Sequence, residues 1–266
     1  MGKERWKMPI SLSPFSYPGL CSGNHWAIDD EATLARHIAR IALGQARHVE
    51  RIVAAAGGVP APQTSSGAKS SAIALLTVPS GNDPWHRDGW MFQAMSWIAA
   101  RRAEPDAYIR APHMILAHKG FDGLSVRLDK TKKKVLAAVV FEDKATDNPR
   151  ATIRNDVWPE FEALERGDRE NVLTAEVVSI LTGVPGCDID AAVETILWRR
   201  TRHFRVSITA GDSHQDDEGR KRLFKGYDSV VTGSLARRHA EAVFIPDLRN
   251  WMEALADMAI AHIKKA

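Results

Sequence analysis

The sequence has few cysteines and no long apolar run. Its two cysteines, Cys21 and Cys187, stand far apart and outside any C-x-x-C pair, which excludes a disulfide framework and a zinc ribbon. No apolar segment approaches the roughly 20 residues that span a membrane. The basic residues after Met1 precede proline, serine and glycine rather than the apolar core of a signal peptide. We therefore expect a cytoplasmic protein in a reducing compartment, with no membrane attachment.

An excess of charge of either sign is also absent. The chain has 36 Lys and Arg against 33 Asp and Glu, a formal net charge of +3, so net charge alone does not indicate nucleic-acid binding. The histidines form no H-E-x-x-H motif and no serine has a G-x-S-x-G context, which removes two common hydrolase signatures. A hydrophobic content of 44% over 266 residues is typical of a globular protein with a sizeable core.

The spacing of apolar residues predicts an α/β fold. Residues 1–28 are rich in proline, serine and glycine, so we expect an irregular N-terminal arm before a single domain over 29–266. Helical periodicity predicts helices over 29–56, 89–102, 150–166, 169–181, 189–199 and 247–263. Strands are predicted over 121–128, 135–144, 203–209 and 242–245, while 72–78 fits either a buried strand or a short helix.

Three charged residues lie at the ends of two neighbouring predicted strands. Asp122 begins the 121–128 segment, and Glu142 and Lys144 end the 135–144 segment. Side chains two apart in a strand share a face, so Glu142 and Lys144 project together and Asp143 projects to the other side. Two carboxylates beside an ammonium suit metal-dependent hydrolysis of phosphodiesters. Each residue alone also fits a solvated turn or strand end. The hypothesis of a metal site therefore rests on the three residues taken together.

The order helix, strand with Asp122, strand with Glu142-x-Lys144, helix resembles the core of the PD-(D/E)xK nuclease superfamily over about residues 86–165. The resemblance implies a restriction-endonuclease-like core, with a small mixed sheet flanked by helices and helical additions at both termini. It also implies that Asp122, Glu142 and the backbone carbonyl of Asp143 hold Mg²⁺, with Mn²⁺ as a substitute. Lys144 would position the attacking water or stabilise the phosphate.

Two positions depart from the family pattern. Gln93 aligns with a helix glutamate that supports the metal site in many members, and it brings an amide in place of a charge. Phe121 precedes Asp122 where the family name specifies proline, although Gly120 and Gly123 flank the motif as they do in many members. The resemblance therefore assigns Gln93 as an outer-shell or direct ligand.

Basic side chains cluster at two places outside this motif. One group lies at the tip between the two predicted strands, and the other surrounds the start of the 203–209 strand, where aromatic residues interleave with arginines. Both suit contacts with a nucleic-acid backbone. For the lysines a solvated turn is the better explanation, because hairpin tips are often rich in lysine. The predicted phosphate contacts are Lys132, Lys133, Arg199, Arg200, Arg202 and Arg205.

These residues together predict a metal-dependent DNA nuclease. The G-x-D-G and E-x-K pattern, in a chain of this size without a motor motif, is similar to the nuclease component of the Hachiman antiviral defence system of prokaryotes. That similarity implies a helicase-like ATPase partner. The alternative is a catalytically inactive subunit of the same fold that binds DNA or a partner protein. The preference for DNA or RNA, endonuclease or exonuclease action, and the oligomeric state stay open.

Overall fold

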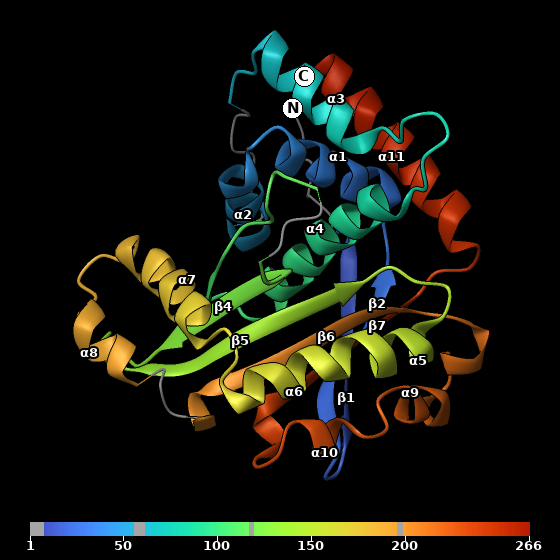
Figure 1. The fold of residues 1–266 in the computed structure, drawn as a ribbon. Helices are drawn as coiled ribbons and strands as arrows, with labels where there is room; N and C mark the ends of the chain where they lie inside the picture. The colour runs from blue at the N-terminus through green and yellow to red at the C-terminus, as the bar shows by residue number, and fades with distance from the viewer. Residues whose placement is uncertain (1–7, 56–61, 117–119, 196–198) are drawn as a thin grey trace.

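The computed structural model describes residues 8–55, 62–116, 120–195 and 199–266, and its centre is one curled, mixed sheet of seven strands (Figure 1). The strand order is β1-β2-β7-β6-β5-β4-β3, in which β2, β7, β6 and β5 run parallel and the remaining strands pair antiparallel. The strands are β1 (Ile10–Tyr17), β2 (Cys21–Ile28), β3 (Tyr108–Ile109), β4 (Gly123–Leu128), β5 (Val135–Lys144), β6 (Arg202–Ala210) and β7 (Arg238–Phe244). The α/β class is confirmed, but the prediction of a small sheet is wrong.

The prediction of an irregular arm over residues 1–28 is wrong for residues 10–28, which form the β1–β2 hairpin. The residues that suggested a loop have specific places in this hairpin. Pro14 lies in an edge strand, where a missing N–H is tolerated. A Cβ at Gly23 would lie 1.7 Å from the carbonyl oxygen of Ala240, so glycine allows β2 to pair closely with β7.

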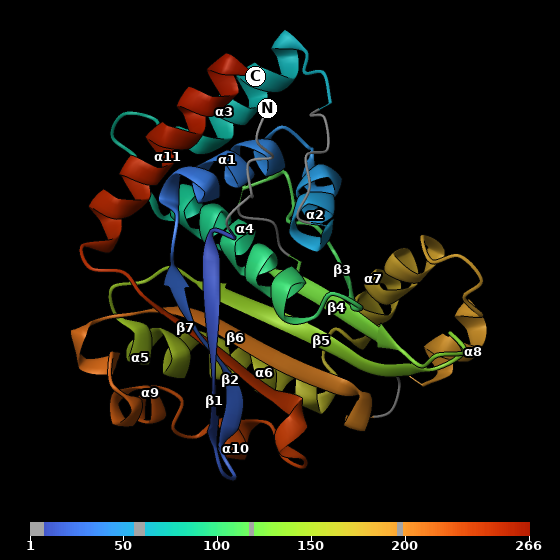
Figure 2. The same ribbon diagram turned by 180° about the vertical axis from the view of Figure 1, so that it is seen from behind.

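Helices cover both faces of the sheet, in the three-layer arrangement of α/β proteins (Figures 1 and 2). One face packs against α1 (Glu31–Ala42), α2 (Ala46–Ala55), α3 (Ser66–Leu76), α4 (Trp85–Ala103) and α11 (Leu248–Lys265). The other packs against α5 (Pro149–Thr152), α6 (Trp158–Arg166), α9 (Asp217–Leu223) and α10 (Tyr227–Val230), with α7 (Glu170–Thr182) and α8 (Ile189–Glu194) beside the β4–β5 tip. None of the described helices is both long and apolar enough to cross a membrane.

Several predicted helices differ in their bounds. The helix predicted over 29–56 is two helices, because the chain turns at Gly44 with a φ of +76° that favours glycine. The helix predicted over 150–166 contains a π-helical turn at Ile153–Val157. Residues 72–76 belong to α3, which agrees with the helical alternative. The helix predicted over 189–199 ends at Glu194, and residues 196–198 lie outside the described part of the chain.

Strand β5 is buried on both faces and therefore fixes the direction of the charged residues at its end. Val139 and Phe141 belong to the core shared with α4, whereas Val140 belongs to the core on the opposite face. The same alternation turns Glu142 and Lys144 to one face and Asp143 to the α4 face. The charged residues thus emerge at the carboxyl end of a parallel strand, the edge where α/β sheets usually bind ligands.

Candidate functional site

The ammonium group of Lys144 contacts two carboxylates at the end of β5. Its Nζ lies 2.8 Å from Oε2 of Glu142 and 3.1 Å from Oδ2 of Asp122. Asp122 reaches this position because it directly precedes β4, which pairs antiparallel with β5. The three charged residues singled out from the sequence are therefore brought together, and their two carboxylates converge on one cationic nitrogen.

The residues around Asp122 explain the motif in which it lies. A Cβ at Gly123 would lie 2.6 Å from Cδ2 of Phe141, its partner across the strands, so glycine permits this pairing. Phe121, which precedes Asp122, is 1% exposed and packs into the core. Its carbonyl oxygen accepts a hydrogen bond of 2.6 Å from Arg110. A buried ring and a backbone hydrogen bond therefore anchor the residue that precedes Asp122.

Two further donors hold the Asp122 carboxylate. The side-chain amide of Gln93, from α4, donates to Oδ1 at 2.8 Å. The backbone N–H of Asp143 donates to Oδ2 at 2.9 Å. Gln93 is thus in contact with Asp122, and its role as a metal ligand stays a prediction. Both oxygens of Asp122 are oriented from two elements, so the carboxylate has a fixed direction.

Burial changes the protonation of the cluster. It raises the pKa of Glu142 from 4.5 to about 7, although the ammonium of Lys144 opposes this shift. Burial alone would lower the pKa of Lys144, but Glu142 and Asp122 together raise it above its ordinary value. Lys144 therefore stays protonated at neutral pH. When both carboxylates are ionised, the cluster carries one more negative charge than positive charge.

Asp143 begins a chain of buried polar groups beneath α4. Its Oδ1 accepts a hydrogen bond of 2.7 Å from the hydroxyl of Ser96, and Ser96 in turn accepts one of 2.7 Å from Arg205. The Nε of Arg205 lies 3.8 Å from Oε1 of Glu241, whose other oxygen accepts a hydrogen bond from Trp26. Asp143 is therefore a structural side chain on the far face of β5, and only its backbone faces Asp122.

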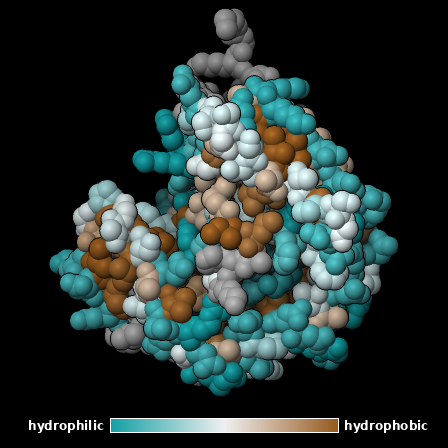
Figure 3. Space-filling view, turned by 45° about the horizontal axis from the view of Figure 1, so that its top comes forward, coloured by the Kyte–Doolittle hydropathy of each residue, from teal (hydrophilic) through white to brown (hydrophobic). Residues whose placement is uncertain are grey.

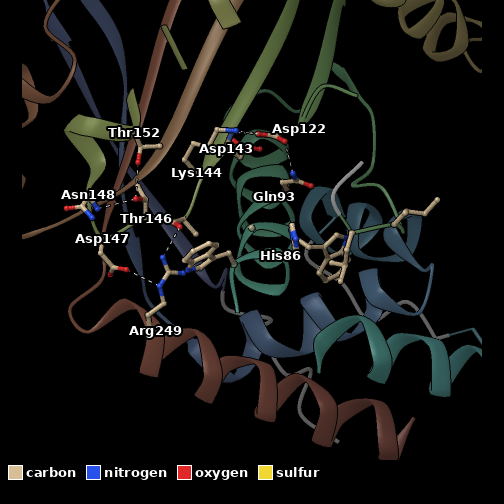
Figure 4. Close-up of a pocket in the computed structure, with 16 residues that line it drawn as sticks. His86, Gln93, Asp122, Asp143, Lys144, Thr146, Asp147, Asn148, Thr152 and Arg249 are labelled. Carbon is tan, nitrogen blue, oxygen red and sulfur yellow. Dashed lines mark hydrogen bonds and ion pairs between the residues drawn. The ribbon is translucent and has the colours of Figure 1, made fainter. Parts of the chain in front are cut away.

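A cleft of about 480 Å³ opens beside the cluster. Figure 4 shows Asp122, Lys144 and Gln93 at one end of it, with Arg249 and Asp147 toward the other. Glu142 is not among the residues that line the cleft: it is buried, on the same face of β5 as Val140. The remaining lining residues are Trp85, His86, Gly89, Trp90, Ile115, Leu116, Asp143, Ala145, Thr146, Asn148 and Thr152.

Arg249, from the last helix, is a cleft residue that the sequence did not reveal. Its guanidinium lies 2.7 Å from Oδ2 of buried Asp88 and 2.9 Å from Oδ2 of Asp147, and it also donates to the carbonyl of Ala145. It thereby ties the loop after Lys144 to α4 and α11. The sequence held no signal for this role, because Arg249 stands more than 100 residues from both of its partners in the chain.

The predicted phosphate contacts are separated by the fold. Arg202 and Arg205 are 8% and 6% exposed, so the prediction that they contact phosphate is corrected: both guanidiniums are used inside the protein, Arg202 on the carbonyl of Leu164 and Arg205 on Ser96. The sequence did not reveal this burial. An alternating pattern is typical of a strand with one exposed face, whereas β6 is buried on both faces. Arg200 is exposed, and the side chain of Arg199 lies outside the described part of the structure.

The two lysines lie at the β4–β5 tip. Lys133 is exposed, whereas Lys132 is half-buried, has a φ of +57° and donates a hydrogen bond of 2.7 Å from Nζ to the carbonyl of Pro185. The tip is at the opposite end of β5 from Glu142 and Lys144. Any phosphate contact made by Lys133 is therefore remote from the cleft.

The described residues contain no group of three or more His, Cys, Asp or Glu side chains that could hold a metal ion. Comparison with family models finds no match for this chain, and comparisons with curated proteins and with solved structures find none either. The chemistry of the site therefore has to be argued from its own geometry.

The pH dependence of stability tests the burial of Asp143. Burial raises its pKa from 3.8 to about 6, although Arg205 opposes the shift. A carboxyl with a higher pKa in the folded state stabilises the fold at low pH, and that contribution is lost as the pH rises through about 6. We therefore expect Asp143→Asn to gain stability relative to the native chain by roughly 2–3 kcal/mol between about pH 4 and about pH 7. Urea unfolding across this range, in EDTA, measures the difference, and a constant difference would contradict it.

Proposed function

We propose that this protein is a Mg²⁺-dependent nuclease that hydrolyses phosphodiester bonds of DNA. The observation that carries the proposal is the convergence of Asp122 and Glu142 on the ammonium of Lys144, because Asp122 and Lys144 also line the cleft. Mg²⁺ is usually held by one or two carboxylates, with water and substrate phosphate completing its coordination. Two carboxylates therefore suffice, and a cluster of three is not required.

The donor set fits a hard cation. Both acids offer oxygens, and the ammonium that bridges them occupies the kind of position that a divalent cation takes between two carboxylates. Asp122 and Glu142 would hold the ion, with the Asp143 carbonyl and the Gln93 amide oxygen as further ligands. Bound there, Mg²⁺ supplies Lewis acidity toward the phosphate and lowers the pKa of a water molecule.

The chain's own residues supply orientation and charge. Gln93 and the Asp143 N–H fix the direction of the Asp122 carboxylate. The ammonium of Lys144, which Asp122 and Glu142 hold beside the cleft, would offset negative charge on a phosphate bound there. Arg249 lines the same cleft, where its ion pairs with Asp88 and Asp147 hold the loop that follows Lys144.

A DNA-binding or partner-binding subunit without catalysis is the second candidate. The absence of a three-membered acid cluster among the described residues favours it, because Gln93 adds no charge to the two carboxylates. The proposals of a helicase-like partner and of a role in antiviral defence rest on the resemblance to the Hachiman nuclease component alone. Cleavage by the purified chain separates the two candidates directly.

Substitution of the converging residues tests the nuclease. We expect Glu142→Gln and Lys144→Met each to lower Mg²⁺-dependent cleavage of plasmid DNA by roughly 10²–10⁴-fold, the usual effect of removing one catalytic group. Glu218→Gln and Lys221→Met change an exposed ion pair on α9 and serve as matched controls with native rates. Equal cleavage by all four variants, each with a native circular dichroism spectrum, would contradict the assignment.

A third carboxylate tests the metal site without an activity assay. Gln93→Glu replaces the amide that donates to Asp122 with a like charge, so in EDTA we expect about 1–2 kcal/mol lower stability. The added oxygen ligand should in turn bind Mg²⁺ more tightly. The rise in melting temperature caused by Mg²⁺ is then larger for the variant than for the native chain. An equal rise in both proteins would show that Gln93 does not face a cation site.

A further inference from the structure

Part of the cleft wall, apart from the charged cluster, is apolar and aromatic. Trp85 and Trp90 come from the start of α4, and Ile115 and Leu116 come from the segment before Asp122. Trp90 is 3% exposed and its indole N–H donates to the carbonyl of His113 at 2.5 Å. This hydrogen bond ties the segment to α4, so the two parts of the wall are held together.

Exposed apolar side chains gather at this wall. The large hydrophobic residues that stand exposed in the described chain are Trp85 (65%), Met114 (44%), Ile115 (69%) and Leu136 (59%). Two of the four line the cleft and a third, Met114, adjoins Ile115 in the sequence. The face seen in Figure 3 is hydrophilic over much of its area, with hydrophobic patches near its centre and at its left. Exposed apolar groups that concentrate at one cleft mark a binding surface.

The two walls together define a ligand with an anionic part and a flat apolar part. A phosphate lies beside Lys144 in the proposed function, and a group attached to it would meet Trp85 and Ile115 across the same cleft. In a duplex the faces of the bases are stacked inside the helix and cannot reach an aromatic wall. An unpaired nucleotide offers both its phosphate and its base, and base stacking on aromatic side chains is a general means of binding single strands.

We propose that the cleft binds single-stranded DNA, with an unpaired base against Trp85 and the adjoining phosphate at Lys144. This inference rests on the proposed function for the position of the phosphate, and it names the substrate as a single strand or an unpaired end. Trp85 stacks on the base, and Ile115 closes the opposite edge. Neither side chain takes part in the chemistry.

Binding in EDTA tests this inference separately from catalysis. The full-length native chain and its variants are titrated against a fluorescein-labelled oligo(dT) and a labelled duplex hairpin, and anisotropy gives both dissociation constants. We expect Trp85→Ala to weaken oligo(dT) binding about tenfold or more, the effect of losing one stacking partner, and to change hairpin binding less than about twofold. Trp85→Phe retains most of the affinity because its ring still stacks. Leu136→Ala removes an equally exposed apolar group outside the cleft and leaves both affinities unchanged.

Unchanged oligo(dT) binding by Trp85→Ala, or an equal loss for oligo(dT) and hairpin, would overturn the inference. The second result would mean that Trp85 contacts a duplex or supports the fold. Cleavage with Mg²⁺ is measured in parallel on the native chain. If the native chain does not cleave DNA but its oligo(dT) binding depends on Trp85, the nuclease is contradicted and the single-strand site is supported. If it cleaves DNA but its oligo(dT) binding does not depend on Trp85, the nuclease is supported and the single-strand site is contradicted.

Discussion

The ion pairs that Lys144 makes with Asp122 and Glu142 are the interaction on which the site depends. Glu142 is buried, and a buried carboxylate without a partner is costly, so the ammonium stabilises a charge that the fold would otherwise reject. The same nitrogen holds Asp122 and thereby fixes the segment that leads into β4. Lys144 thus stabilises the buried charge at the end of β5 and also holds the segment that enters β4 beside the cleft.

The surroundings of this cluster are rigid for reasons that lie in other parts of the chain. Beneath α4, Ser96 is hydrogen-bonded to both Asp143 and Arg205, so the two charged side chains have partners inside the core. At the open end, Arg249 joins the last helix to Asp88 and Asp147. The charged residues are therefore supported by α4 and α11, which cover one face of the sheet, and this favours a fixed geometry at the cleft.

The sequence predicted those features that are set by residues close together in the chain. The apolar alternation of β5 and the two-residue spacing of Glu142 and Lys144 placed both on one face, and the structure brings Asp122 to them. The β1–β2 hairpin was missed because Pro14 and Gly23 are explained only by the edge position and by the close approach of β7. Arg205 was misassigned because its buried partners come from distant elements. Tertiary packing, which no local pattern encodes, decided these positions.

The position of a divalent cation in crystals of this protein soaked in Mn²⁺ is the most direct test of metal binding by Asp122 and Glu142. The prediction is an anomalous peak within bonding distance of Asp122 and Glu142, with the ammonium of Lys144 no longer in contact with both carboxylates. Crystals that show no Mn²⁺ at these residues under saturating conditions, with Lys144 still bridging the two acids, would contradict a metal-dependent nuclease and favour a binding subunit.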